Sequence, residues 1–180
     1  MRNNLILNNI GKRFGDFWAL RGVRASIPSG KITAFIGPNG AGKTTLFHLI
    51  AGTLRPDEGS IQFKGERLSG LPPYRIARRG IGRQFQDVRV FGGLTVLDNV
   101  LVGMIPHGRQ DAIHAWVKAR STRDLIKKYR EDAERWIEHV GLQDNLERNA
   151  RDLSFGQQKL LSMARLFACG FEFLLLDEPT

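Results

Sequence analysis

The first thirty residues alternate apolar and polar side chains with the period of a β-strand. The clearest stretch is VRASI at residues 23–27, which turn residues follow at 28–30. Because successive side chains of a strand point to opposite faces, this pattern predicts short strands over residues 1–30 that form an antiparallel layer. The same alternation at residues 60–64 predicts another half-buried strand.

Two further stretches predict the elements of an α/β core. Residues 31–36 have the composition of a strand, and residues 43–51 place apolar residues at helical spacing until Gly52 ends the run. Residues 173–176 are wholly apolar, as is typical of a strand buried on both faces. The chain therefore alternates strands and helices.

The second half of the chain is predominantly helical in pattern. Thr95 and Asp98 form a T-x-x-D start signal for a helix that runs to about Met104. Residues 111–140 predict a longer helix that ends at Gly141. Its apolar side recurs at helical spacing and is interpreted as core. These residues are Leu125, Ile126, Tyr129, Ala133, Trp136, Ile137 and Val140.

A last helix is predicted from the capping-box pair Ser154 and Gln157 to Gly170. The strand at residues 173–176 then ends in Asp177 and Glu178. Two carboxylates at the end of a buried strand are costly unless they handle a cation or a proton. They are therefore candidates for chemistry.

Composition favours one soluble globular domain. The chain has 180 residues, of which 42% are hydrophobic and 25% charged. No apolar run approaches the about 20 residues that span a membrane, and the N-terminus does not resemble a signal peptide. The sequence therefore predicts a cytosolic protein. Cys169 has no second cysteine to pair with, and the four histidines lack metal-ligand spacing.

The net charge of +9 is concentrated locally. Five arginines of the middle third have only Asp87 between them, and a solvated face is the simplest interpretation. Docking on anionic lipid, worth about 1 kcal/mol per basic residue, and a nucleic-acid footprint are the alternatives. The cluster consists of Arg75, Arg78, Arg79, Arg83 and Arg89.

Residues 37–45 read GPNGAGKTT, which matches the phosphate-binding loop G-x-x-x-x-G-K-T. Glycines let the backbone N–H groups approach a nucleotide's phosphates closely, and the helix that follows points its positive end at the anion. Lys43 would add a full charge, and Thr44 a hydroxyl for Mg²⁺. The candidate nucleotide ligands here are Gly37, Asn39, Gly40, Gly42, Lys43, Thr44 and Thr45.

Three aromatic residues near the first turn are candidates for stacking on adenine. They are Phe14, which Gly15 follows at a predicted strand end, Phe17 and Trp18. Stacking on a base is worth about 1–3 kcal/mol and tolerates any base. A core position is the alternative for each of them.

The order of these features resembles the ATPase subunits of ABC transporters. The phosphate loop is followed by Gln86, by LSFGQQ at residues 153–158, and by DEPT at residues 177–180. Kinases, helicases and GTPases share the loop, but LSFGQQ shortly before the Asp-Glu strand is much more specific. The resemblance covers nearly the whole chain. It implies an α/β fold, a P-loop NTPase of the ABC nucleotide-binding type, with an antiparallel β subdomain and a helical subdomain.

The resemblance also implies how the domain is divided. One ABC ATPase domain would occupy residues 1–180, with the β subdomain and P-loop core in 1–85, the Gln-loop and helical subdomain in 86–156, and the return to the core in 157–180. Family members continue with a dimer-contacting loop and a histidine at the γ-phosphate. The sequence is therefore expected to be C-terminally incomplete, and inactive as a fragment.

Roles follow from the resemblance residue by residue. Phe14 stands where the family stacks an aromatic, usually tyrosine, on adenine. Ser154, Gly156 and Gln157 match the signature that contacts the ATP of the opposite subunit, although Phe155 replaces a glycine of the commoner LSGGQ.

The metal and catalytic roles come from the same resemblance. Gln86 would touch Mg²⁺ and sense the membrane subunits. Asp177 would steady Mg²⁺ together with Thr44. Glu178 would polarise the attacking water as general base. Catalysis is thus expected from Glu178 and Gln86, with ATP and Mg²⁺ bound.

Residues 83–91 and 94–96 resemble the importers for branched-chain amino acids. Such ATPases work as homo- or heterodimers that sandwich ATP, beneath two transmembrane permeases on the cytoplasmic face of the membrane, and an extracytoplasmic solute-binding protein supplies the solute. The resemblance therefore implies ATP hydrolysis that powers uptake of branched-chain or related amino acids, with no nucleic acid as partner. The alternatives are an ABC ATPase of repair or translation and the ATPase of an exporter.

Overall fold

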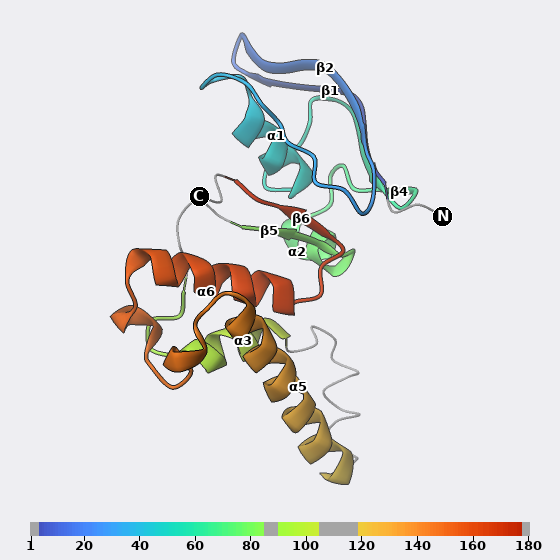
Figure 1. The fold of residues 1–180 in the computed structure, drawn as a ribbon. Helices are drawn as coiled ribbons and strands as arrows, with labels where there is room; N and C mark the ends of the chain where they lie inside the picture. Colours follow the sequence, from blue (N-terminus) through green and yellow to red (C-terminus); the bar gives the residue numbers. More distant parts are fainter. Residues whose placement is uncertain (1–3, 85–89, 105–118, 178–180) are drawn as a thin grey trace. The chain divides into compact units, whose positions relative to one another are not determined.

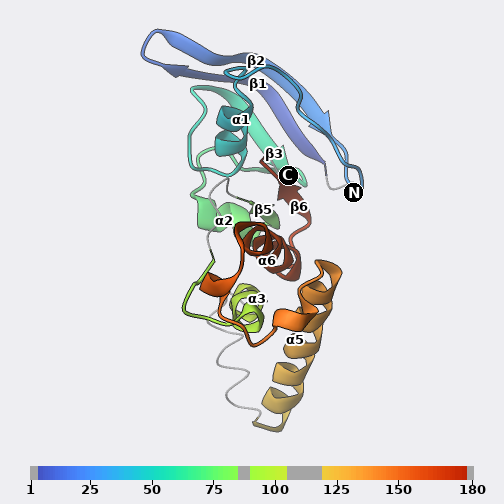
Figure 2. The ribbon, with the colours of Figure 1, turned by 60° about the vertical axis from the view of Figure 1, so that its left-hand side comes forward.

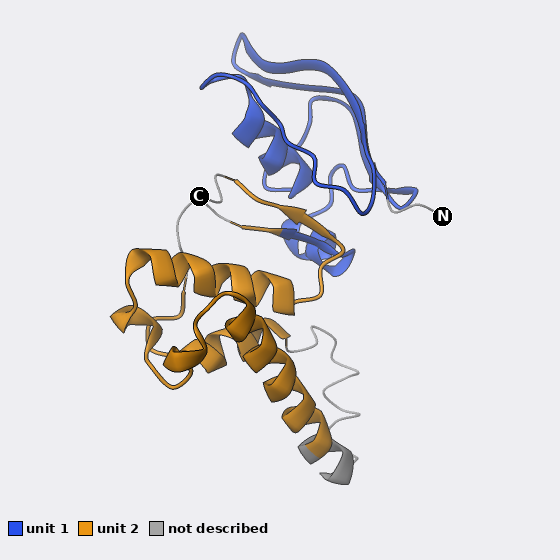
Figure 3. Cartoon of the chain, viewed as in Figure 1, with its two compact units in different colours: residues 1–82 blue, residues 83–180 orange. Residues whose placement is uncertain are grey.

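The computed structural model describes residues 4–84, 90–104 and 119–177, with no side chains described for 119–123. The chain divides into two compact units, Met1–Gly82 and Arg83–Thr180 (Figure 3). Each unit has its own hydrophobic core.

Unit 1 is built on a four-stranded sheet in the order β2-β1-β3-β4. The strands pair antiparallel, and the β1–β2 hairpin runs from the pair Leu5 and Ile27 to the pair Phe14 and Phe17. The predicted antiparallel layer is confirmed. Its strands are β1 (Leu5–Phe14), β2 (Phe17–Ile27), β3 (Glu58–Phe63) and β4 (Glu66–Arg67).

One face of this sheet is buried by the alternation that the sequence predicted. Ile61 and Phe63 are both buried on β3, as expected from their spacing. Gly59, the second residue of β3, has a φ of +81°, and a Cβ atom there would lie 2.2 Å from the carbonyl oxygen of Asn8. Only glycine therefore fits where β3 enters the sheet beside β1.

Two helices complete unit 1, namely α1 (Lys43–Ile50) and α2 (Pro73–Arg78). Helix α1 lies against the hairpin of β1 and β2 (Figure 2). It buries Leu46, Leu49 and Ile50, and it ends before Gly52, whose φ is +74°. The predicted helix and its glycine stop are confirmed.

The strand predicted at residues 31–36 is not formed. The side chains of Ile32 and Ile36 are fully exposed, at 103% and 94%, while Phe35 contacts Phe47 edge to face at 6.1 Å. A strand exists only where its backbone pairs with a neighbour, and no strand of the described chain pairs with residues 31–36. Local composition indicated the strand, but its formation depends on partners far along the chain.

In the described residues of unit 2, three helices pack around one core (Figure 1). They are α3 (Val96–Met104), α5 (Ala119–His139) and α6 (Phe155–Ala168). Short 3-10 turns at Gln143–Asn145 and Ala150–Asp152 connect α5 to α6, and β6 (Phe173–Leu175) follows. The buried core consists of Val96, Leu97, Val100, Ala133, Ile137, Leu142, Ala150, Leu153, Leu161 and Ala164.

The helix predicted over residues 111–140 is confirmed for Ala119–His139, while residues 111–118 lie outside the described residues. Fewer of its apolar residues are buried than the helical spacing predicted. Ala133 and Ile137 are wholly buried, but Ile126 is 61% exposed. Trp136 lies at the edge of the core against Phe167, with ring centroids 5.6 Å apart. Helix α5 extends beyond α3 and α6 in Figure 1.

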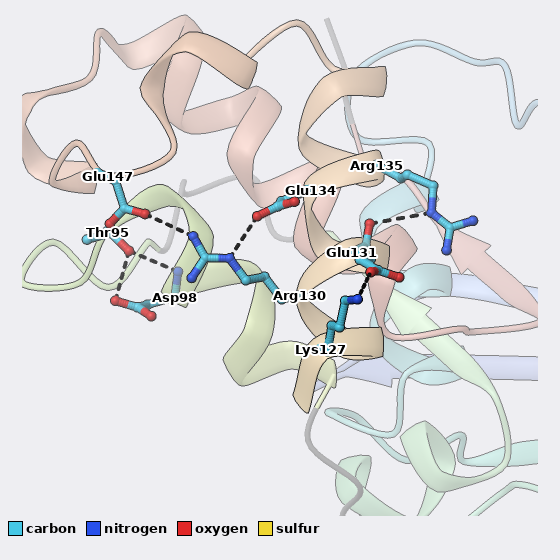
Figure 4. Close-up of polar contacts among 8 residues, drawn as sticks. All are labelled: Thr95, Asp98, Lys127, Arg130, Glu131, Glu134, Arg135 and Glu147. Atoms are coloured by element: carbon cyan, nitrogen blue, oxygen red, sulfur yellow. Dashed lines mark hydrogen bonds and ion pairs between the residues drawn. The ribbon is translucent and has the colours of Figure 1, made fainter. Parts of the chain in front are cut away.

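Exposed charged side chains project from α5 and form ion pairs (Figure 4). Arg130 bonds Glu134 at 2.8 Å and Glu147 at 3.3 Å, which ties the helix to the turn that follows it. The bond to Glu134 raises the pKa of Arg130. Lys127 and Glu131 form a looser pair at 3.8 Å, one turn apart. This arrangement suits a solvated helix face.

Candidate functional site

The candidate phosphate loop leads directly into α1. Gly40 and Gly42 both have left-handed backbone, at φ +81° and +84°. A Cβ atom on Gly42 would lie 2.7 Å from the carbonyl oxygen of Ala19 on β2, so this position requires glycine for space as well as for φ. The backbone N–H of Ala41 donates to Pro38 at 3.2 Å and closes the turn.

Lys43 bends back over the loop that precedes it. Its Nζ donates to the carbonyl oxygens of Gly37 at 2.6 Å and Pro38 at 2.8 Å. The ammonium group and the first N–H groups of α1 therefore belong to the same short segment, which is the arrangement that binds phosphate. Asn39, Gly40 and Thr44 are exposed, so the loop is open to a ligand.

The three aromatic candidates differ in exposure. Phe14 ends β1 and is 49% exposed, and Phe17 begins β2 and is 67% exposed. Trp18 is half-buried, and its ring would lie 3.0 Å from a Cβ atom on Gly11. Trp18 therefore packs on the sheet, whereas Phe14 and Phe17 present their rings to solvent.

Asp57 fixes the end of β1 beside Phe14. Its carboxylate accepts the backbone N–H of Arg13 at 2.8 Å and pairs with the Lys12 ammonium at 3.1 Å. The Arg13 bond, and after it Lys12, hold the pKa of Asp57 below its ordinary value of 3.8. Lys12 also lies 5.7 Å from the ring centroid of Phe14. The sequence carried no clear signal for this clamp, because 44 residues separate Arg13 from Asp57.

The predicted capping box at the start of α6 is confirmed. The Ser154 hydroxyl accepts the Gln157 N–H at 3.3 Å, and the Gln157 side chain accepts the Ser154 N–H at 3.0 Å. Ser154, Phe155 and Gly156 are exposed. A Cβ atom on Gly156 would meet nothing within 4 Å. Nothing in the described chain therefore requires glycine there, although glycine weakens a helix.

The end of β6 places Asp177 in a buried position, with 8% of its side chain exposed. The Arg83 guanidinium, equally buried, donates from Nη2 to Asp177 Oδ2 at 3.3 Å. Arg83 thus supplies the cation that a buried carboxylate needs. Glu178 and Gln86, the predicted general base and Gln-loop residue, lie outside the described residues.

The position of Arg83 differs from the prediction of a basic cluster on the surface. Arg75 is exposed on α2 beside Tyr74, and Arg79 pairs with Glu66. Arg83 instead is buried against Asp177, and Arg89 lies outside the described residues. The prediction of one surface cluster that includes Arg83 is therefore wrong. Charge density along the sequence did not reveal a partner 94 residues away.

The donor atoms suit a hard cation. Mg²⁺ prefers oxygen ligands and is bound by one or two carboxylates together with phosphates and water. Asp177 carries such a carboxylate after β6, and Thr44 carries a hydroxyl oxygen at the start of α1. In the described part of the chain no three His, Cys, Asp or Glu side chains gather into an all-protein metal site. The side chains of Asp177 and Thr44 each have an oxygen donor of the kind that a magnesium ion arriving with a nucleotide accepts.

A glycine-rich loop that opens a helix, in a chain with an antiparallel sheet and a helical unit, defines a nucleotide-binding domain of the P-loop NTPase class. The family model described as ABC transporter matches residues 20–180. The chain belongs to this family, and it is an ATP-binding, ATP-hydrolysing subunit of the ABC type.

Similar proteins agree with this assignment. The chain is 37% identical over 175 residues to the high-affinity branched-chain amino acid transport ATP-binding protein BraF of Pseudomonas aeruginosa, and likewise to LivG of Escherichia coli K12. In both cases 97% of the chain matches 69% of the relative. An ABC-transporter ATP-binding cassette solved in its ADP conformation has a TM-score of 0.78 and 34% identity, over 99% of this chain and 69% of that one. The expected fold class is confirmed.

None of the helices in the described part of the chain has the length and apolar character that a membrane-spanning helix needs.

Proposed function

We propose that the protein hydrolyses MgATP to power import of branched-chain or related amino acids. The observation that carries this proposal is the 37% identity to BraF and LivG over 97% of the chain. Their names state branched-chain amino acid transport. The segments 83–91 and 94–96, which resemble such importers, support the same substrate class.

The geometry of the phosphate loop and of Asp177, together with the family resemblance for Gln86 and Glu178, supports a separate role for each residue. Lys43 and the N–H groups at the start of α1 hold the phosphates, with Gly40 and Gly42 shaping the loop. Phe14 stacks on adenine from the end of β1. Asp177, Thr44 and Gln86 hold Mg²⁺, which neutralises charge on the transferred phosphoryl group when bound. Glu178 accepts the proton of the attacking water.

The exposed start of α6 supports pairing with a second ATPase subunit. Ser154 and Gly156 are open to solvent, and the capping box holds the helix end in place. A helix start of this kind offers N–H groups to the γ-phosphate of an ATP held by the partner. The assembly proposed is two ATPases on the cytoplasmic face of the membrane beneath two permeases, with an extracytoplasmic solute-binding protein.

The decisive experiment is reconstitution of the full-length subunit with its permeases in liposomes. Solute-loaded binding protein is expected to stimulate ATP hydrolysis, by roughly 5- to 150-fold if the whole coupling free energy appeared in the rate. Gln86→Ala should reduce this stimulation more than it lowers ATP affinity. Salt-dependent DNA binding without any response to loaded binding protein would favour a nucleic-acid ATPase instead.

A further inference from the structure

The ion pair of Arg83 and Asp177 joins two strand ends in unit 2. Arg83 is the last residue of β5 (Ile81–Arg83), and Asp177 follows β6. The backbone N–H of Gln84 donates to the carbonyl oxygen of Leu175 at 2.9 Å, so the strands are already held together by their backbones. Both charged side chains are only 8% exposed.

A role in holding β5 and β6 together does not explain well why this buried ion pair is present. Removing two charges from water is costly, and apolar residues of similar volume often replace a buried pair without loss of stability. A guanidinium, however, holds in place the carboxylate oxygen to which it donates, here Oδ2 of Asp177. A role in orienting Asp177 explains why charged rather than apolar side chains occupy these positions.

Orientation matters for the role proposed for Asp177. Mg²⁺ demands near-ideal octahedral geometry, and the groups that hold a metal ligand from behind commonly set its affinity. Arg83 holds one carboxylate oxygen, Oδ2. Holding Oδ2 restricts the rotation of the side chain that would otherwise move the other oxygen, Oδ1.

We propose that Arg83 is a positioning residue for Asp177, which it orients through Oδ2 so that the carboxylate meets the Mg²⁺ of MgATP. The inference rests on the proposed function, because it takes Asp177 as a magnesium-associated residue. Arg83 itself touches neither metal nor nucleotide in this assignment.

The test compares the full-length wild-type protein with Arg83→Met and Arg83→Lys. ATP affinity is measured by calorimetry in EDTA and in Mg²⁺, and Mn²⁺ affinity in the presence of ATP by electron paramagnetic resonance. Loss of an outer-shell partner typically weakens metal binding by about 10–100-fold. Arg83→Met should lower the Mn²⁺ affinity by about 10–100-fold, while its ATP affinity in EDTA stays within about twofold of wild type. Arg83→Lys should lower the Mn²⁺ affinity by less. Arg79→Met, which removes the arginine of the exposed pair with Glu66, is the matched control and should change neither.

Two outcomes would overturn the inference. The first is that Arg83→Met folds and binds Mn²⁺ as tightly as wild type does. The second is that Arg83→Met loses ATP affinity equally with and without metal, because an equal loss indicates a purely structural role. If Arg83→Met fails to fold, Arg83→Lys decides, and unchanged Mn²⁺ affinity in it overturns the inference. Wild-type protein that binds no ATP in either buffer would instead refute the proposed function.

Discussion

Asn99 pairs with both backbone groups of Phe91. Its Oδ1 accepts the Phe91 N–H at 2.8 Å, and its Nδ2 donates to the Phe91 carbonyl oxygen at 3.0 Å. Nδ2 also donates to the Thr95 carbonyl oxygen at 2.9 Å. The side chain is wholly buried on α3, so it fixes the segment before the helix to the helical core.

Asn99→Ala should therefore destabilise the protein. The change leaves the Phe91 N–H without its acceptor, and a donor left unsatisfied costs about 1–3 kcal/mol. Chemical denaturation monitored by circular dichroism measures this as a lower free energy of unfolding. Asn145→Ala, at a partly exposed site with one 3.4 Å contact from Arg148, is the control and should change it by less than about 0.5 kcal/mol. Equal effects of the two variants would refute the anchoring role.

Lys43→Ala should weaken ATP binding. Truncating one partner of a buried charge pair costs about 2–5 kcal/mol, which is roughly 30-fold to several thousand-fold in affinity. Calorimetry of the full-length subunit measures the change, with Lys31→Ala as the control because Lys31 is exposed before the loop. A change below about threefold in Lys43→Ala would remove Lys43 from the phosphate site.

Glu178→Gln should separate binding from chemistry in the full-length subunit. The amide keeps the size of the side chain but cannot accept a proton, so hydrolysis should collapse while ATP-induced pairing persists. Phosphate release and analytical ultracentrifugation measure the two effects. Turnover near the wild-type rate would remove the general-base role from Glu178.

Gly156→Ala should raise the stability of the isolated subunit but weaken its ATP-dependent pairing with a second ATPase subunit. A Cβ atom meets nothing within 4 Å in the chain, so alanine should stabilise the isolated subunit by about 0.4–1 kcal/mol. The same Cβ atom should obstruct the approach of the partner's ATP and weaken ATP-dependent pairing. Gly93→Ala, at another glycine with open space, is the control that should leave pairing intact. Unimpaired pairing in Gly156→Ala would show that this face makes no such contact.

Asp57→Asn should destabilise the protein at neutral pH in a pH-dependent way. The folded-state pKa of Asp57 lies below 3.8, so its stabilising effect is present above that value and is lost as the pH falls through the folded-state pKa. The difference in free energy of unfolding between wild type and Asp57→Asn should therefore shrink on acidification below about pH 4. Asp16→Asn, an exposed aspartate of the neighbouring turn, is the control. A difference that does not vary with pH would mean that the Asp57 charge is not responsible.

The sequence by itself determined the elements whose signals are local. The capping box of Ser154 and Gln157, the helix start at Thr95 and the glycine stops at Gly52 and Gly141 depend on residues within one or two helical turns. The phosphate loop could likewise be predicted from the sequence, because the spacing of its glycines and Lys43 is a property of one short segment. Such features need no distant partner.

Only the tertiary structure decided the features that join distant segments. Residues 31–36 have the composition of a strand but form none, because a strand depends on hydrogen bonds to another part of the chain. The sequence pattern placed Arg83 in a cluster of surface charge, but the structure buries it against Asp177. Likewise, no local pattern predicted that Asp57 accepts the backbone N–H of Arg13. The burial and pairing of a residue depend on which distant segments contact each other in the tertiary structure. The sequence of neighbouring residues carries little information about those contacts.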